Sequence, residues 1–258
     1  MKKLPVIKTM IGALYYPWVL RKPLFKALSI LIVAGVVLST VWWYQWGLGL
    51  IPEYIGWLVA IIFWTLYTLF AVICHRMVLL GVSSVPEYGV GRVGERDFRF
   101  AVALAILMII SMLAPYSVSL IIFLLLGIIK NLPFVPEFNM KINFGINASS
   151  WLFYIGQIFV LSRFGLILPA TAVDERPTLK WAWRTSRGNT LRLMVVLGFL
   201  PWLVYLPSEF LPEDPGVTGY GLYVLTWWLL LPIEITVLSL SYKELVQERE
   251  QEKEQLVL

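Results

Sequence analysis

The chain has 258 residues, of which 59% are hydrophobic and only 14% are charged, whereas an ordinary soluble domain is about 25% charged. This balance excludes a water-soluble core domain. A single cysteine, Cys74, and a single histidine, His75, exclude an intramolecular disulfide and leave too few residues for a metal cluster, so we expect no metal and no cofactor. The net charge of +5 comes from bases beside apolar runs, without the basic motif of a nucleic-acid-binding module, so we expect no nucleic-acid partner.

The 21 Lys and Arg residues are unevenly distributed around six apolar runs. When the ends of these runs are assigned alternately to two sides, eighteen bases fall on one side, Lys130 and Lys141 on the other, and Arg163 within a run. Short loops rich in Lys and Arg stay in the cytoplasm, so this pattern predicts that both termini are cytoplasmic. The predicted fold class is all-α: a polytopic membrane protein with six transmembrane helices and interfacial helices on the cytoplasmic side.

The first predicted span lies between Lys26 and Glu53, and its outer half carries an aromatic belt that includes Trp42 and Trp46. The second, Tyr54 to Cys74, is free of charge for 21 residues, close to the roughly 20 that cross the hydrocarbon. The glycine-rich segment from Gly81 to Arg99 predicts a cytoplasmic loop with a short surface element.

The third apolar run, Arg99 to Lys130, contains thirty residues without a charge and is interrupted by Ala114-Pro115. Two crossings need about 40 residues, so the run predicts one long, kinked or tilted helix rather than a hairpin. The segment from Asn131 to Ala148 is expected to lie along the outer interface. A fourth span is predicted from about Trp151 to Val173.

The fifth predicted span, residues 193–208, has only sixteen residues and contains Pro201, so a re-entrant segment is the alternative here. The sixth runs from about Tyr220 to Tyr242. We therefore predict a single six-span membrane domain over residues 1–242. Residues 243–258 are rich in Glu, Gln, Lys and Arg and predict a charged cytoplasmic tail, which extends the sixth span as a solvated helix.

Two charged residues lie deep within the apolar spans, Arg163 in the fourth and Glu234 in the sixth. Counted from the predicted cytoplasmic ends, they lie about 15 and 12 Å deep. An unpaired charge at this depth costs several kcal/mol, so we expect the two residues to form a buried ion pair. This pair is either a structural clamp between two helices or, together with Gln157, part of a polar path.

The segment from Pro177 to Asn189 combines bases with tryptophans. Lys180, Arg184 and Arg187 recur at i, i+4 and i+7 and predict one basic stripe, with Trp183 on the neighbouring face. This pattern is typical of a short helix in the cytoplasmic interface, where each base gains about 1 kcal/mol from anionic lipid. The helix is either a topological anchor or a specific site for lipid headgroups.

The run from Ser162 to Glu175 contains Arg163, a Pro-Ala pair and an acidic end, and it is followed by Trp183-Arg184-Thr185-Ser186-Arg187-Gly188-Asn189. These residues resemble a pattern in a broad group of bacterial inner-membrane proteins that includes the membrane domain fused to some glycerophosphoryl diester phosphodiesterases. Ala182, Thr185 and Ser186 stand where that pattern usually has Ser, Leu and Thr. The resemblance implies a six-helix domain in the bacterial inner membrane. We expect no hydrolysis, because the 258 residues contain no phosphodiesterase barrel.

The chain contains no Gly-rich phosphate loop, paired-carboxylate site or Gly-x-Ser-x-Gly element, and the adjacent Cys74 and His75 point in different directions on a helix. We therefore expect a non-catalytic membrane protein, not an enzyme, that binds or organises lipids or a membrane partner. The expected partners are membrane lipids, including anionic ones, and another membrane protein or a second copy of the chain. The alternative is a small transporter or permease subunit with Arg163 and Glu234 along its polar path.

Overall fold

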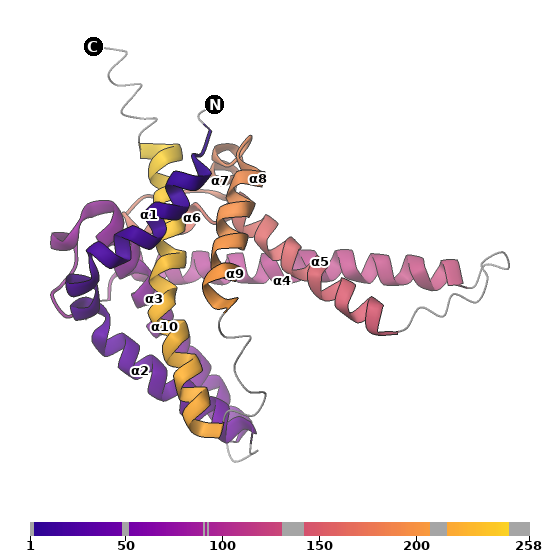
Figure 1. Cartoon of the computed structure of the whole chain (residues 1–258), viewed down its shortest axis with the longest axis horizontal. Coiled ribbons are helices and arrows are strands. Elements are labelled where there is room, and N and C mark those ends of the chain that lie inside the picture. The colour runs from indigo at the N-terminus through magenta and orange to yellow at the C-terminus, as the bar shows by residue number, and fades with distance from the viewer. Residues whose placement is uncertain are drawn as a thin grey trace, which may run out of the picture.

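The structure describes residues 3–47, 52–89, 91, 93–130, 142–206 and 216–247, and within them helices are joined by turns and loops without a strand. The structure is a computed structural model (Figure 1). In chain order its elements are α1 (Val6–Val19), α2 (Arg21–Gly47), α3 (Glu53–Leu80), the 3-10 turn η1 (Val82–Ser84), α4 (Glu95–Lys130), α5 (Ile142–Phe164), α6 (Ile167–Ala172), α7 (Leu179–Thr185), α8 (Thr190–Met194), the π-helical turn η2 (Val195–Phe199), α9 (Leu200–Tyr205), α10 (Gly216–Tyr242) and the π-helical turn η4 (Lys243–Gln247). The predicted all-α class is confirmed.

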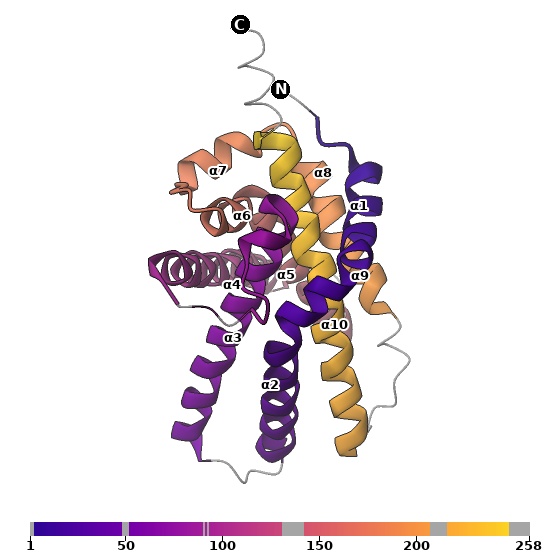
Figure 2. The same cartoon turned by 90° about the vertical axis from the view of Figure 1, so that its left-hand side faces the viewer.

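Helices α2, α3 and α10 pack together as a three-helix bundle (Figures 1 and 2). Their apolar stretches are Arg21–Trp42, Tyr54–Leu80 and Gly221–Gln247, each long enough to cross the roughly 30 Å of hydrocarbon in a bilayer. Large apolar side chains face away from the bundle, for example Trp57 on α3 and Leu222 on α10. These three helices indicate a membrane protein.

Helices α4 and α5 form a hairpin that runs sideways from this bundle (Figure 1). α4 is one helix of 36 residues, so the prediction of a single long helix in this region is confirmed. The prediction of six spans is not supported, because the described residues contain three helices of the required length and apolarity, and the hairpin does not run alongside them. The apolar pattern of the sequence cannot predict the direction in which this hairpin runs, since helix tilt is set by packing against neighbouring helices.

The fourth predicted span is divided in two, because α5 ends and α6 begins inside it. Gly165 lies at the break, and a Cβ atom there would come within 2.5 Å of the Leu161 carbonyl oxygen. α5 also begins earlier than the predicted span, at Ile142, so the end of the predicted outer segment 131–148 is helical. Residues 131–141 of that segment lie outside the described residues.

The fifth predicted span consists of three short elements, α8, η2 and α9. Pro201 lies at the start of α9, where its missing N–H group costs little because the preceding turn is π-helical. The apolar stretch Thr190–Leu203 is shorter than the stretches of α2, α3 and α10. It runs beside α10 (Figure 1).

The first helix, α1, lies in a segment where the sequence predicted no element. Asn189 Oδ1 accepts a hydrogen bond from the Leu4 N–H group at 2.8 Å, and Arg192 donates to the Leu4 carbonyl at 2.8 Å. Lys8 pairs with Glu244, beyond the end of α10, at 2.7 Å. The first and last described segments therefore lie at one end of the molecule, which we call the terminal end (Figure 2).

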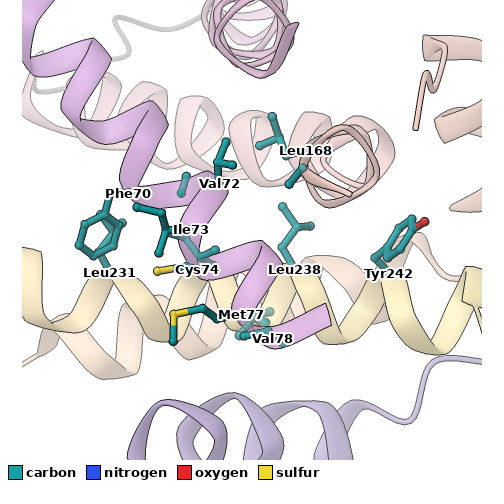
Figure 3. Close-up of a cluster of buried hydrophobic side chains, with 14 of the residues drawn as sticks. Phe70, Val72, Ile73, Cys74, Met77, Val78, Leu168, Leu231, Leu238 and Tyr242 are labelled. Atoms are coloured by element: carbon teal, nitrogen blue, oxygen red, sulfur yellow. The ribbon is translucent and has the colours of Figure 1, made fainter. Parts of the chain in front are cut away.

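The packed core lies where α3 meets α10 and α6. Figure 3 shows Phe70 and Met77 of α3 among buried side chains of α10 such as Leu238. Close approach of α2 to α10 depends on Gly35, because a Cβ atom there would lie 2.3 Å from the ring of the fully buried Trp228. A small residue at this position lets the two helices pack closely.

As the sequence predicts, the helix continues past Tyr242, into η4. Glu244, Leu245 and Val246 are buried, so the prediction of a solvated tail is wrong for this turn. The ion pair with Lys8 explains how a carboxylate can be buried here. Residues 248–258 of the predicted tail lie outside the described residues.

Candidate functional site

A polar cluster connects the end of α3 to the turn that follows α6. Arg76 of α3 donates to Asp174 Oδ2 at 2.8 Å and to the Ala172 carbonyl at 3.0 Å. A third bond, from its Nε to the Ser84 carbonyl, is 3.3 Å long. Asp174 has a φ of 71°, in the left-handed region that aspartate tolerates better than most residues. Arg76 thus holds the acidic turn in place.

The start of α4 belongs to the same cluster. Asp97, in the first turn, accepts the Gly94 N–H group at 2.9 Å and is 4% exposed. A carboxylate there satisfies a free N–H group and interacts favourably with the helix dipole. Arg96 pairs with Asp97 at 3.1 Å and lies 4.0 Å from Asp174. Arg96 therefore connects α4 to the turn after α6.

A groove of about 420 Å³ lies between α4 and the segment from α6 to α7. Its lining is mostly apolar and includes Val102, Ile106 and Ile167. Four charged residues also line it: Glu95, Arg99, Glu175 and Arg176. A lining that combines apolar and charged side chains fits an amphiphile, because the chain of such a molecule avoids water while its headgroup seeks charge. We call this the α4–α6 groove.

The four charged residues that line the groove differ in how fully they are paired. Glu95 pairs with Arg176 at 3.3 Å and lies 3.7 Å from Arg99 Nε, which is buried and has no hydrogen-bond partner within the described part of the chain. Glu175 accepts a hydrogen bond from the Tyr242 hydroxyl. Two guanidinium groups thus share one carboxylate, while the second carboxylate is held by a phenol. Together the two guanidinium groups have more N–H donors than this one carboxylate can accept, and Arg176 is exposed, so an anionic group can bind there.

Helix α7 is shorter than the predicted segment from Pro177 to Asn189 and begins at Leu179, two residues after Pro177. The Thr178 hydroxyl accepts the Trp181 N–H group at 3.1 Å and caps the helix. Of the predicted basic stripe, Lys180 and Arg184 lie on α7, and Arg187 follows it. All three bases are exposed and form no ion pair within the residues that the structure describes; Trp183 is 42% exposed.

Arg163, predicted deep in the fourth span, lies at the end of α5 beneath α7. Its guanidinium carbon is 4.0 Å from the centroid of the Trp183 ring and 5.9 Å from that of Phe159. Its Nε and Nη1 atoms are buried and have no hydrogen-bond partner in the part of the chain that the structure describes. Its carbonyl accepts the Ser186 hydroxyl at 3.1 Å. The structure thus joins two features that the sequence analysis treated separately, the intramembrane base and the interfacial helix.

Glu234 is half-buried on α10 and interacts electrostatically with Tyr67 on α3 and Tyr154 on α5. Gln157 is half-buried on α5. The described contacts of Arg163 are with Phe159, Trp183 and Ser186. Its ion pair with Glu234 stays a prediction.

Three polar residues near the site have roles that sequence reasoning missed. In the sequence, Asn189 is only the last residue of the family pattern. In the structure, its Oδ1 atom accepts a hydrogen bond from the Leu4 N–H group. Ser239 is 2.8 Å from His75 Nδ1 in the buried core, which explains how the histidine is accommodated there. Tyr242 anchors Glu175. Each contact links residues far apart in the chain, and no local pattern encodes such contacts.

Comparison with protein-family models, with curated proteins and with solved structures gives no match for this chain. Among the described residues, no group of three or more His, Cys, Asp or Glu side chains is arranged to hold a metal ion. The fold and the site together define the class of the protein: an all-helical membrane protein with a charged, grooved junction between α4, α6 and α7.

Proposed function

We propose that this chain is a non-catalytic integral membrane protein of the bacterial inner membrane, with both termini in the cytoplasm, that binds lipid headgroups at the α4–α6 groove. The observation that carries this proposal is the groove itself, whose lining is largely apolar and includes two guanidinium groups, those of Arg99 and Arg176, that share one carboxylate. The family resemblance supports the same region, because Ile167, Thr171 and Glu175 of the run from Ser162 to Glu175 line the groove.

The exposed bases of α7 support a preference for anionic lipid. Lys180, Arg184 and Arg187 stand beside the groove without an ion pair among the described residues, and each is worth about 1 kcal/mol at an anionic surface. The two acids of the adjoining turn, Asp174 and Glu175, are held by Arg76 and Tyr242. The exposed bases therefore dominate the charge in this region, and they attract phosphate.

The test is lipid retention by the full chain after purification in mild detergent, measured by native mass spectrometry. Arg99→Gln with Arg176→Gln should reduce retention of phosphatidylglycerol by more than about tenfold, because two charge-assisted contacts are lost. Arg21→Gln with Lys22→Gln removes the same charge on α2 and is the matched control. Equal retention in the two double variants would contradict the proposal.

The alternative function, a small transporter or permease subunit, is not favoured by the cavities. Arg163, Gln157 and Glu234 line neither the α4–α6 groove nor the second cavity described below. Binding of a partner protein or a second copy of the chain is compatible with the exposed apolar faces, but no feature of the described residues selects it over lipid.

A further inference from the structure

A second cavity, of about 510 Å³, lies within the three-helix bundle. It is distant in the chain from the α4–α6 groove and shares no residue with it. Half of its ten described lining residues are aromatic: Trp42, Phe63, Trp64, Tyr223 and Trp227. None of the ten is charged. A ligand that fits here is therefore neutral. We call this the aromatic cavity.

The aromatic walls are held in fixed positions by ring contacts. Trp227 stacks on Phe63 and on Tyr67, with ring centroids 6.2 Å apart and planes 25° apart in both pairs. Trp228 meets Phe63 edge-on at 5.7 Å and is itself fully buried. Flat, braced aromatic surfaces favour a planar ring over a flexible chain, because stacked rings gain contact without ordering many torsions.

A hydroxyl group in the cavity lacks a hydrogen-bond partner. Ser39 lines the cavity and is 5% exposed, yet its Oγ atom bonds to no group of the described chain. Most hydroxyls of α3 and α10 behave differently and donate to the carbonyl four residues earlier: Thr65, Thr226, Thr236, Ser239 and Ser241. In an apolar interior such a local bond is the usual solution. Ser39 therefore keeps a donor available to the cavity.

The same bundle holds three more buried donors that have no partner among the described residues. They are Thr40 Oγ1 on α2, Thr68 Oγ1 on α3 and the indole nitrogen of Trp228 on α10. A buried polar group left unpaired is costly, and such groups are rare in stable interiors. Every one of these groups can donate, and the indole nitrogen can only donate. Of these groups and Ser39, Ser39 is the one that lines the aromatic cavity, so a ligand there needs an acceptor oxygen for its hydroxyl.

We propose that the aromatic cavity binds a neutral, lipid-soluble ring compound with carbonyl oxygens, of the quinone type. The uncharged lining selects a neutral molecule, the braced aromatic walls select a planar ring, and the Ser39 hydroxyl donates to one carbonyl oxygen. A cavity of about 510 Å³ falls within the size range of small-molecule sites. This inference is independent of the proposed headgroup site, because it rests on different residues.

The test titrates decylubiquinone into the full chain in detergent and counts bound molecules by native mass spectrometry. The wild type should bind one quinone. Ser39→Ala should weaken binding roughly three- to tenfold, as loss of one hydrogen bond requires. Ser241→Ala makes the same chemical change at a hydroxyl bonded to Val237 and is the matched control. Ala60→Phe fills the cavity and leaves the Ser39 hydroxyl in place, so it should abolish binding. This second variant tests the proposal independently if Ser39→Ala does not fold.

The outcomes separate the proposal from simpler occupants. If 1-decanol, which has the chain without the ring, displaces the quinone at equal concentration, the cavity is a groove for alkyl chains and the proposal is overturned. It is equally overturned if no quinone binds to the wild type, or if Ser39→Ala and Ser241→Ala bind it alike. Arg99→Gln with Arg176→Gln, which should lose phosphatidylglycerol, should bind the quinone as the wild type does. The two proposals can therefore fail separately.

Discussion

The guanidinium carbon of Arg163 lies over Trp183, 4.0 Å from the centroid of the indole ring. Arg163 lies in the last turn of α5 and Trp183 belongs to α7, so this contact ties the surface helix to the apolar hairpin. Phe164 adds to it, with its ring 5.6 Å from Trp183. The interaction of a cation with a desolvated aromatic face offsets part of the cost of burying Arg163 among apolar side chains.

We expect Arg163 and Trp183 to be energetically coupled. In a double-mutant cycle with Arg163→Met and Trp183→Leu, thermal unfolding in detergent should give a coupling free energy of about 0.5–2 kcal/mol. Trp57→Leu is the control, because Trp57 is 69% exposed on α3 and has no described contact with Arg163. A coupling no larger than that of the control would mean that the indole does not stabilise the cation.

The predicted ion pair between Arg163 and Glu234 is tested by the same method. Glu234→Gln combined with Arg163→Met should show a coupling of roughly 3 kcal/mol if the two charges meet, because removal of one partner leaves a buried charge unpaired. Zero coupling would leave Trp183 as the main partner of Arg163 and would place Glu234 with Tyr67 and Tyr154 alone.

Gly35 should be intolerant of any side chain. A Cβ atom at this position would lie 2.3 Å from the Trp228 ring, so Gly35→Ala should destabilise the bundle by about 1–3 kcal/mol through overpacking. The matched control is Gly221→Ala on α10, where the nearest atom is 3.9 Å away. Trp228→Leu should rescue Gly35→Ala by removing the clash. Thermal unfolding of the three single variants and the rescued double variant measures these effects, and an equal loss at positions 35 and 221 would contradict the packing.

The sequence predicted the helical class and the single long helix α4 well, because runs of apolar residues carry this information locally. Of the predicted basic stripe, Lys180 and Arg184 are exposed on α7, whereas Arg187 follows the helix. The sequence did not predict the sideways course of the α4–α5 hairpin or the helix α1. Both depend on contacts between residues far apart in the chain, such as the bond from Leu4 to Asn189. The sequence did not predict the α4–α6 groove for the same reason, since Arg99 and Arg176 belong to different segments.

Asn189 should hold the start of the chain against the terminal end. Asn189→Ala leaves the buried Leu4 N–H group without an acceptor and should cost about 1–3 kcal/mol. Asn189→Asp keeps the acceptor oxygen and is the matched control. Amide hydrogen exchange of Leu4 measures the result directly: exchange should accelerate strongly in the alanine variant and little in the aspartate variant. Unchanged exchange in both would show that Arg192 alone holds this segment.

Membrane topology can be tested with single cysteines in a Cys74→Ser background, which removes the one natural thiol. The charge pattern predicts that a cysteine at position 22 reacts only from the cytoplasm, and that cysteines at positions 137 and 213 react only from outside. Positions 137 and 213 lie outside the described residues, in the links before α5 and α10. A membrane-impermeant maleimide, applied to intact cells and to inverted vesicles, distinguishes the two sides.

Each outcome of the labelling decides a different part of the topology. Because a hairpin returns to the side from which it starts, the location of the termini does not depend on whether α4 and α5 cross. Reaction of position 137 from outside would therefore establish the hairpin as two further crossings, whereas reaction from the cytoplasm would leave it on the inner side of the membrane. Reaction of position 213 from the cytoplasm would place the start of α10 on the wrong side. In that case the segment 190–205 does not cross, the two termini lie on opposite sides of the membrane, and the ion pair of Lys8 with Glu244 cannot form.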